Sequence, residues 1–318
     1  MYQVKKDSPY DPPVDCKKWV AEQSLNFSEL TDQICEKAHW TKSQIDEALQ
    51  VGGIFINKKR VPSDQIPTQI QKDSIIEIFR FVVPPKPISL TPENILYEDD
   101  FLLAVNKPAW LPVQGTKVSK KYSLEEQLKD LTGNRGVMAA HRLDRQTSGI
   151  VLFGKDSAET SWIMKQFAGR RIDKKYLATL NAIPQKNEDE ISGYLWRDFT
   201  RLPRVFFHLS SIELAKSKFS QTQFKVLDTM SGMALVEAKP ITGRTHQLRV
   251  HFASIGCPII GDYLYDKDVA ANSPRIQLHA SRLKIPIKGT NEIRQIEAPL
   301  PADFIYFNKA SISSGVES

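Results

Sequence analysis

The chain has 318 residues, of which 41% are hydrophobic and 25% charged, a composition typical of an ordinary globular protein with room for two domains. Its net charge of +6 suits a polyanionic partner without requiring one. No run approaches the roughly 18 apolar residues of a membrane helix, and the polar N-terminal segment lacks the apolar stretch of a secretory signal. Cys16, Cys35 and Cys257 form no Cys-x-x-Cys pair, so we expect a reducing, cytoplasmic location.

The first 82 residues predict a short arm and a small folded unit. Residues 1–15 are polar and proline-rich, and we expect them to be flexible. Within residues 16–82, Leu30 and Ile34 recur at helical spacing, and Thr41 begins a capping box before a second helix. A tight hairpin with its turn at residues 57–59 and a closing strand over residues 74–81 complete a small α/β domain.

Prolines at four positions between residues 83 and 92 predict an extended linker, because proline cannot join the interior of a sheet. Residues 93–306 then predict a second domain in which strands outnumber helices and most neighbouring strands are joined by hairpins, such as the one with its turn at Ser231 and Gly232. The expected fold class is therefore α+β, with a mixed but mainly antiparallel sheet. Residues 307–318 are expected to form a disordered tail.

An aspartate lies between two arginines in the segment HRLDRQTSG. Asp144 precedes a predicted buried strand, so the turn could present its carboxylate to a binding site. Arg142 and Arg145 would favour the ionised form of this carboxylate if they lie close to it. The alternative is an ordinary cap or surface ion pair, which is the commoner role of a loop aspartate, and the segment alone does not decide between the two.

A second basic segment, TGRTHQLRVH, holds Arg244, His246 and Arg249. On a helix, Arg249 shares a face with His246, while Leu248 faces the interior. This polar face predicts either a site for an anion or a carboxylate, or a solvated cationic surface.

No cofactor motif is present in the sequence. His246, His251 and Cys257 match no tetrahedral zinc spacing, and the chain has no Gly-x-x-x-x-Gly-Lys, Gly-x-Gly-x-x-Gly or Gly-x-Ser-x-Gly segment. We therefore expect no metal, no nucleotide cofactor and no serine hydrolase. Tyr176, which starts a predicted strand after two lysines, could be a core residue or part of an active site.

Three segments, HRLDRQTSG, KKYLATL and PITGRTHQLRVHFASIGCPIIGDYLY, occur in this order and together resemble the RluA-type RNA pseudouridine synthases over residues 93–306. Residues 16–82 resemble an S4 RNA-binding domain through VGGIFINKKRV and DSIIEIF. The resemblance implies a pseudouridine synthase fold, RNA as the partner, and no metal or cofactor. It also implies an isomerase that moves the base of uridine from an N1 link to a C5 link.

The resemblance further implies roles for single residues. Asp144 matches the catalytic carboxylate, Arg249 the arginine that pairs with it, and Tyr176 the tyrosine that stacks on the base and helps to remove the C5 proton. Arg142 matches the residue that fills the gap left by a flipped base. The further substrate-binding residues implied in this way are His141, Arg145, Arg244, His246 and Leu248.

The sequence leaves the exact reaction and its substrate open. Asp144 could attack the ribose C1′ or take a proton from C2′. The S4-like unit favours 23S-type large-subunit ribosomal RNA, and transfer RNA is the alternative substrate. The alternative functions are a non-catalytic RNA-binding protein of ribosome assembly and a carboxylate enzyme that acts on small molecules. A monomer is the expected state.

Overall fold

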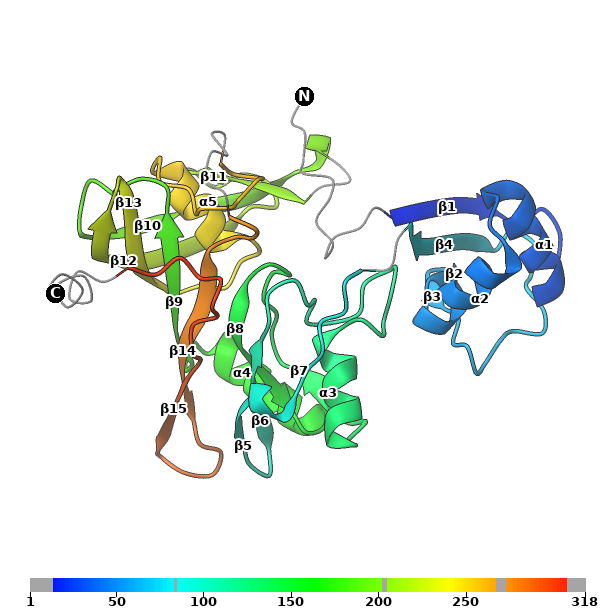
Figure 1. The fold of residues 1–318 in the computed structure, drawn as a ribbon, viewed down its shortest axis with the longest axis horizontal. Coiled ribbons are helices and arrows are strands. Elements are labelled where there is room, and N and C mark those ends of the chain that lie inside the picture. The colour runs from blue at the N-terminus through cyan, green and yellow to red at the C-terminus, as the bar shows by residue number, and fades with distance from the viewer. Residues whose placement is uncertain (1–13, 83–84, 202–204, 267–272, 308–318) are drawn as a thin grey trace, which may run out of the picture. The chain divides into compact units, whose positions relative to one another are not determined.

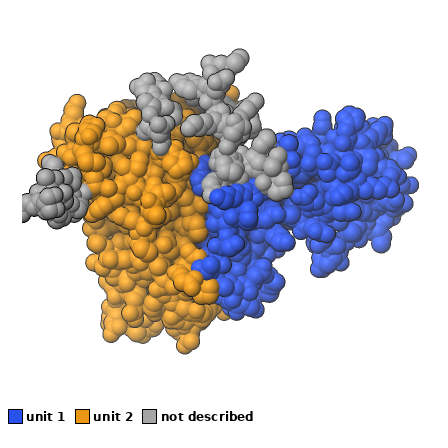
Figure 2. Space-filling view, in the orientation of Figure 1, with its two compact units in different colours: residues 1–91, 110–135 blue, residues 92–109, 136–318 orange. Residues whose placement is uncertain are grey.

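The computed structural model describes residues 14–82, 85–201, 205–266 and 273–307. Nearly all of the predicted arm and tail, and the first two residues of the predicted linker, lie outside these residues. Two compact units are coloured in Figure 2, residues 1–91 with 110–135 and residues 92–109 with 136–318. Because residues 110–135 group with the first unit, the division at residues 83–92 and the domain bounds drawn from it stay a prediction.

The first unit holds a four-stranded antiparallel sheet in the order β1-β4-β2-β3 (Figure 1). Its strands are β1 (Val14–Val20), β2 (Ile54–Ile56), β3 (Lys59–Arg60) and β4 (Ile75–Phe81). Its helices are α1 (Phe27–Ala38), α2 (Lys42–Val51) and α3 (Leu124–Thr132). The sequence did not predict β1, because most of its side chains are exposed and no apolar alternation marks it.

Local signals explain why the elements of this unit begin and end where they do. The predicted capping box is confirmed, since Thr41 Oγ1 accepts a hydrogen bond from the Gln44 N–H and Gln44 Oε1 accepts one from the Thr41 N–H. The predicted hairpin between β2 and β3 is confirmed as well. Asn57 and Lys58 at its turn have φ values of 50° and 64°, as a two-residue turn of a twisted hairpin requires.

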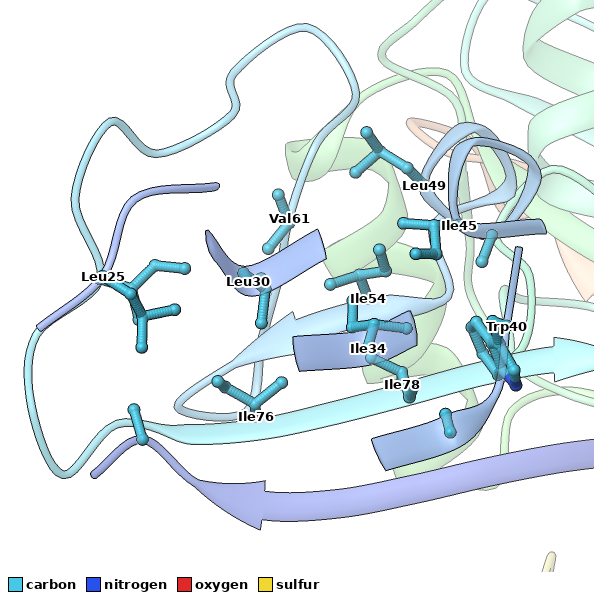
Figure 3. Packing of buried hydrophobic residues seen from close by; sticks show 14 residues of the cluster. Leu25, Leu30, Ile34, Trp40, Ile45, Leu49, Ile54, Val61, Ile76 and Ile78 are labelled. Atoms are coloured by element: carbon cyan, nitrogen blue, oxygen red, sulfur yellow. The ribbon is translucent and has the colours of Figure 1, made fainter. Parts of the chain in front are cut away.

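An apolar core joins both N-terminal helices to one face of this small sheet (Figure 3). Ile76 and Ile78 alternate along β4 and point to that face. The helix residues packed on them recur at the spacing of one helical face and are Leu30, Ile34, Ala38, Ile45, Ala48 and Leu49. Burial of these side chains stabilises the unit by roughly 1.5–3 kcal/mol for each large aliphatic residue.

The second unit is built on an eleven-stranded sheet, whose main path has the order β11-β10-β12-β13-β9-β14-β8-β6-β5 (Figure 1). In addition, β15 pairs with β14 and β7 pairs with β8. Within the described residues every pair is antiparallel except that of β14 with β8. The predicted α+β class with a mixed, mainly antiparallel sheet is therefore confirmed.

The strands of this sheet are β5 (Ile95–Glu98), β6 (Leu102–Lys107), β7 (Met138–Ala139), β8 (Ser148–Gly154), β9 (Asp173–Leu180), β10 (Glu188–Asp198), β11 (Phe206–Ser210), β12 (Lys218–Met230), β13 (Met233–Pro240), β14 (Leu278–Pro286) and β15 (Ile293–Glu297). The helical elements are α4 (Ser157–Ala168), α5 (Gln247–Ser254) and two short 3-10 turns, Pro92–Asn94 and Phe199–Arg201. The hairpin predicted with its turn at Ser231 and Gly232 is confirmed, because it joins β12 to β13.

Each long helix of the second unit covers a different part of the sheet. Ile163 of α4 packs with residues of β6 and β8, whereas Leu248 and Phe252 of α5 pack with residues of β9 and β13. The interior direction predicted for Leu248 is thus confirmed, and the opposite side of α5 is left to its polar residues.

A single glycine allows the parallel pairing that lies beside the Asp144 turn. Gly149 of β8 has φ +109°, and a Cβ there would lie 2.3 Å from the carbonyl oxygen of Ala280 on β14. Only glycine tolerates both the conformation and the close approach. The close contact of β8 with β14 therefore explains why glycine follows Thr147 and Ser148 in the segment after Asp144.

Candidate active site

Asp144 lies in the loop between β7 and β8, and backbone hydrogen bonds fix this loop from several sides. The Thr147 N–H donates to the Asp144 carbonyl at 3.1 Å and closes a turn. Gln146 Oε1 accepts the N–H of Ile276 at 3.1 Å, which anchors the turn near the start of β14. The carboxylate of Asp144 is therefore carried by a rigid turn, and its side chain is still 29% exposed.

A buried lysine holds the same loop. Lys107, the last residue of β6, is fully buried, and its Nζ donates to the carbonyl oxygens of Pro108 at 2.9 Å and Arg145 at 3.1 Å. Burial lowers the pKa of Lys107 well below its ordinary value, although the negative charge of Asp144 opposes this. Lys107 thus couples the end of β6 to the Asp144 turn by both hydrogen bonds and charge.

Arg249 of α5 contacts two carboxylates at once. Its Nη1 donates to Asp144 Oδ2 at 3.0 Å, while Nε and Nη2 donate to the two oxygens of Asp262 at 2.7 and 2.8 Å. The side chain of Asp262 is 0% exposed and that of Arg249 is 5% exposed. The two-pronged bond to Asp262 fixes the plane of the guanidinium, so that one N–H is aimed at Asp144.

The charges of this cluster keep Asp144 ionised. Burial alone would raise the pKa of the Asp144 carboxyl, but Arg249, His246 and Lys107 together outweigh burial and hold the pKa below its usual value. Burial alone would likewise lower the pKa of Arg249, but first Asp262 and then Asp144 raise it above its ordinary value. At neutral pH the cluster therefore holds an ionised carboxylate beside a permanently charged guanidinium.

His246, immediately before α5, also approaches Asp144. Its backbone has φ 56°, which few residues other than glycine adopt, and such strain is often found at functional sites. Its Nε2 lies 3.8 Å from Asp144 Oδ2, and its Nδ1 lies 2.8 Å from the hydroxyl oxygen of Tyr265. Burial and, to a smaller extent, Arg249 lower the pKa of His246 to about 4, so the ring is neutral at pH 7.

Tyr176 lies on β9, between Ala238 of β13 and Ala280 of β14, and packs against the apolar core under α5. Burial and the negative charge of Asp144 raise the pKa of its phenol, which keeps the hydroxyl protonated at neutral pH. The influence of Asp144 indicates that the two side chains share one region.

The remaining predicted site residues lie in different surroundings. Arg142 and Arg244 are exposed, and Arg244 Nε donates to the carbonyl oxygen of Phe219 at 3.0 Å. His141 Nε2 accepts the N–H of Leu152 at 3.0 Å, and burial lowers its pKa to about 3. The structure thus brings Arg249 and His246 to Asp144 and places Tyr176 on β9 within reach of its charge. Arg142 and Arg244 stay on the surface, and His141 bonds to the backbone.

Leu248 and Arg145, the last two predicted substrate-binding residues, are less exposed. Leu248 is buried in the core under α5, and Arg145 is half-buried next to Asp144. Their contacts with a substrate stay a prediction, as do those of the other residues that were assigned in this way.

Three residues of the cluster were not singled out from the sequence: Lys107, Asp262 and Tyr265. Asp262 and Tyr265 both lie in GDYLYD, a short turn after α5, and Gly261 there has φ +80°. An acidic residue directly after glycine, with a tyrosine three residues on, was the available signal. Apolar residues precede the segment and charged residues follow it, so nothing in it shows that its carboxylate is buried on an arginine.

Neither a metal centre nor a membrane span is indicated in the part of the chain that the structure describes. No group of three or more His, Cys, Asp or Glu side chains is placed so that it could hold a metal ion there. None of the described helices has the length and apolar character needed to cross a membrane.

Comparisons with known proteins identify the family of this chain. Residues 101–254 match the family model of RNA pseudouridylate synthases. The chain is 31% identical over 287 residues to the ribosomal large subunit pseudouridine synthase C of Rickettsia bellii, covering 85% of this chain and 92% of the relative. It is also 31% identical over 277 residues to the protein of the same name from Escherichia coli, covering 81% and 85%.

Solved structures give the same result. Human RNA pseudouridylate synthase domain containing 1 matches with a TM-score of 0.57 and 26% identity, covering 71% of this chain and 96% of that one. Human RNA pseudouridylate synthase domain containing 4 matches with a TM-score of 0.55 and 27% identity, covering 67% and 90%. This chain belongs to the RluA-type family of RNA pseudouridine synthases, and it is therefore an isomerase that acts on RNA.

Proposed function

We propose that the protein converts specific uridines of large-subunit ribosomal RNA to pseudouridine, with Asp144 as the catalytic carboxylate. The observation that carries this proposal is the partly exposed Asp144 carboxylate, held ionised by Arg249 at 3.0 Å. The choice of RNA rests on the relatives from Rickettsia and Escherichia coli, which are named ribosomal large subunit pseudouridine synthases. The net charge of +6 suits such a polyanion.

An ionised carboxylate is what either route of the reaction requires. Attack on the ribose C1′ needs a nucleophilic oxygen, and removal of the C2′ proton needs a base. Arg249 and His246 both approach Oδ2, so Oδ1 is the oxygen that these two groups do not engage. We assign the reaction to Oδ1, with Arg249 as the group that holds the carboxylate charged and in one orientation.

The other assigned residues act on the base and the strand. Tyr176 supplies a neutral phenol ring on which the detached uracil stacks. It holds the base in place while the C5 proton passes to solvent, because its own hydroxyl is already protonated. The target base must leave its stack at a cost of a few kcal/mol, and the exposed Arg142 side chain fills the gap. Arg145, Arg244, His246, His141 and Leu248 complete the contacts to the substrate.

The proposal also covers residues 16–82, the cellular location, the oligomeric state and the absence of a cofactor. Residues 16–82 act as an S4-like RNA-binding domain, and the exposed Lys58 and Lys59 of their hairpin contact phosphates. The enzyme works in the cytoplasm, where its RNA is found, as a monomer and without a cofactor.

Site-resolved mapping of pseudouridine in the wild-type and deletion strains tests the function. We expect one or more positions of large-subunit RNA to lose pseudouridine on deletion. A plasmid copy should restore them, and a copy with Asp144→Asn should not. Loss confined to transfer RNA would refute the proposed substrate while leaving the isomerase intact. An unchanged map of all RNAs would favour a role in binding alone.

A further inference from the structure

Tyr265 stands outside every role assigned so far, although it contacts His246. Its hydroxyl oxygen accepts the backbone N–H of Phe207 on β11 at 3.1 Å and lies 2.8 Å from His246 Nδ1. A phenol has one proton to give. In the part of the chain that the structure describes, Nδ1 is the only acceptor bonded to this hydroxyl, so the phenol proton points to Nδ1.

The direction of this hydrogen bond determines where His246 carries its own proton. A neutral imidazole has one N–H, and the nitrogen that accepts a hydrogen bond cannot be the protonated one. Because Nδ1 accepts from Tyr265, the proton of His246 is on Nε2. The opposite tautomer would leave the phenol proton of the half-buried Tyr265 without an acceptor among the described residues, which is costly.

Nε2 faces the reacting carboxylate. It lies 3.8 Å from Asp144 Oδ2, the oxygen that Arg249 contacts at 3.0 Å. At that distance an N–H attracts the carboxylate, whereas a lone pair would repel it. The separation is longer than a hydrogen bond, so the donor can still close on the carboxylate, or on a substrate oxygen beside it, during the reaction.

The ring is held in place by its neighbours. The Phe207 ring lies 5.8 Å from the imidazole and the Tyr265 ring 5.7 Å, both nearly perpendicular to it. The charged groups around it are Arg249 on α5, Asp144 on the β7–β8 loop and Asp262 on the turn that carries Tyr265. That one turn therefore positions both groups that face Asp144, Arg249 through Asp262 and His246 through Tyr265.

We propose that Tyr265 is a positioning residue, which fixes His246 in the neutral tautomer with its proton on Nε2 and so presents an N–H to Asp144. This inference rests on the proposed catalytic role of Asp144. It adds a second hydrogen-bond donor, His246, at the Asp144 carboxylate. The Phe207 N–H on β11 bonds to the Tyr265 hydroxyl, and this hydroxyl in turn determines which nitrogen of His246 carries the proton.

Nitrogen NMR of the histidine rings tests the tautomer without any RNA. We expect His246, assigned by comparison with His246→Gln, to show a protonated Nε2 and an unprotonated Nδ1 at pH 7. In Tyr265→Phe the two tautomers should mix. A protonated Nδ1 in the wild type, or the same tautomer in Tyr265→Phe, would overturn the proposal.

Kinetics test whether the tautomer matters for the reaction. Tyr265→Phe should lower kcat by about five-fold, the value of one hydrogen bond, with little change in KM. Tyr263→Phe removes a hydroxyl from the same turn and serves as the control that leaves kcat unchanged. In a His246→Gln background, where the amide always offers an N–H, Tyr265→Phe should have no further effect.

The outcomes separate this inference from the proposed function. Suppose that Asp144→Asn is inactive. If Tyr265→Phe then matches the wild type, or if Tyr265→Phe still lowers activity in the His246→Gln background, only the role of Tyr265 is wrong. If Asp144→Asn retains activity, the proposed function fails instead, and the tautomer seen by NMR has no catalytic meaning.

Discussion

The two compact units are stabilised by different kinds of interior. The first unit buries a cluster of apolar, mostly aliphatic side chains between two helices and a small sheet, such as Leu30, Ile45 and Ile78. The second unit adds to its apolar clusters a buried set of charged and polar groups around Asp144, including Arg249 and Asp262. Hydrocarbon packing tolerates small changes in shape, whereas a buried charge without its partner is strongly unfavourable.

This contrast predicts that acid acts mainly on the second unit. Burial lowers the pKa of four histidines there, to about 3 for His141 and about 4 for His246, His251 and His279. Unfolded histidine titrates near 6.5, so between about pH 4 and 6.5 the unfolded state binds more protons and stability rises with pH. Acidification from pH 7 to 5 should therefore destabilise this unit by on the order of 5 kcal/mol.

Amide hydrogen exchange resolved by peptide measures this effect unit by unit. The first unit contains only His39, which is exposed, and it should keep its protection over the same pH range. Equal loss of protection in both units, or none in either, would remove the basis of the comparison.

Removal of Asp262 should give the next largest effect. Asp262→Ala removes the acceptors of Arg249 Nε and Nη2, so that the guanidinium is no longer oriented towards Asp144. Breaking a buried pair in this way should cost about 4 kcal/mol in the free energy of unfolding and lower activity as well. Asp189→Ala, which breaks an exposed pair with Lys186, is the control, and chemical denaturation should show a change below about 1 kcal/mol.

A cavity in the first unit should lower the free energy of unfolding slightly less than the loss of Asp262. Ile34→Ala truncates a fully buried side chain of α1, and the cavity that it leaves should lower the stability of this unit by about 3 kcal/mol. Asp32→Ala on the exposed face of the same helix should be nearly neutral. If the activity of Ile34→Ala at saturating RNA fell as much as that of Asp262→Ala, the cores of the two units would not be independent.

The smallest effect concerns charge on the surface of the first unit. The paired change Lys58→Gln and Lys59→Gln should reduce the slope of log affinity against log salt by roughly 0.7–0.9 for each phosphate that the protein no longer neutralises. Lys225→Gln with Lys284→Gln removes the same charge from the second unit, again from exposed positions. Identical slopes for both double variants would argue against RNA binding by the β2–β3 hairpin.

The sequence predicted the apolar core of the first unit better than the charged cluster around Asp144 in the second unit. Apolar spacing and capping residues are local, so α1, α2, the β2–β3 hairpin and the face of α5 that carries Leu248 follow from short segments. Asp144 and Arg249 could be paired only through resemblance to a family, because 105 residues separate them. Asp262, Tyr265 and Lys107 were missed, since nothing in their own neighbourhoods shows which distant charge or ring they meet.

One enzymatic measurement tests the central claim most directly. Single-turnover assays of pseudouridine formation should compare the wild type with Asp144→Asn, an isosteric change that removes the negative charge and keeps the size of the side chain. Removal of the reacting group should cost several factors of ten, each ~1.4 kcal/mol of barrier, so we expect less than about 1% of the wild-type rate with RNA affinity and unfolding almost unchanged. A rate well above that level in a correctly folded Asp144→Asn protein would contradict the assignment of Asp144 as the catalytic carboxylate.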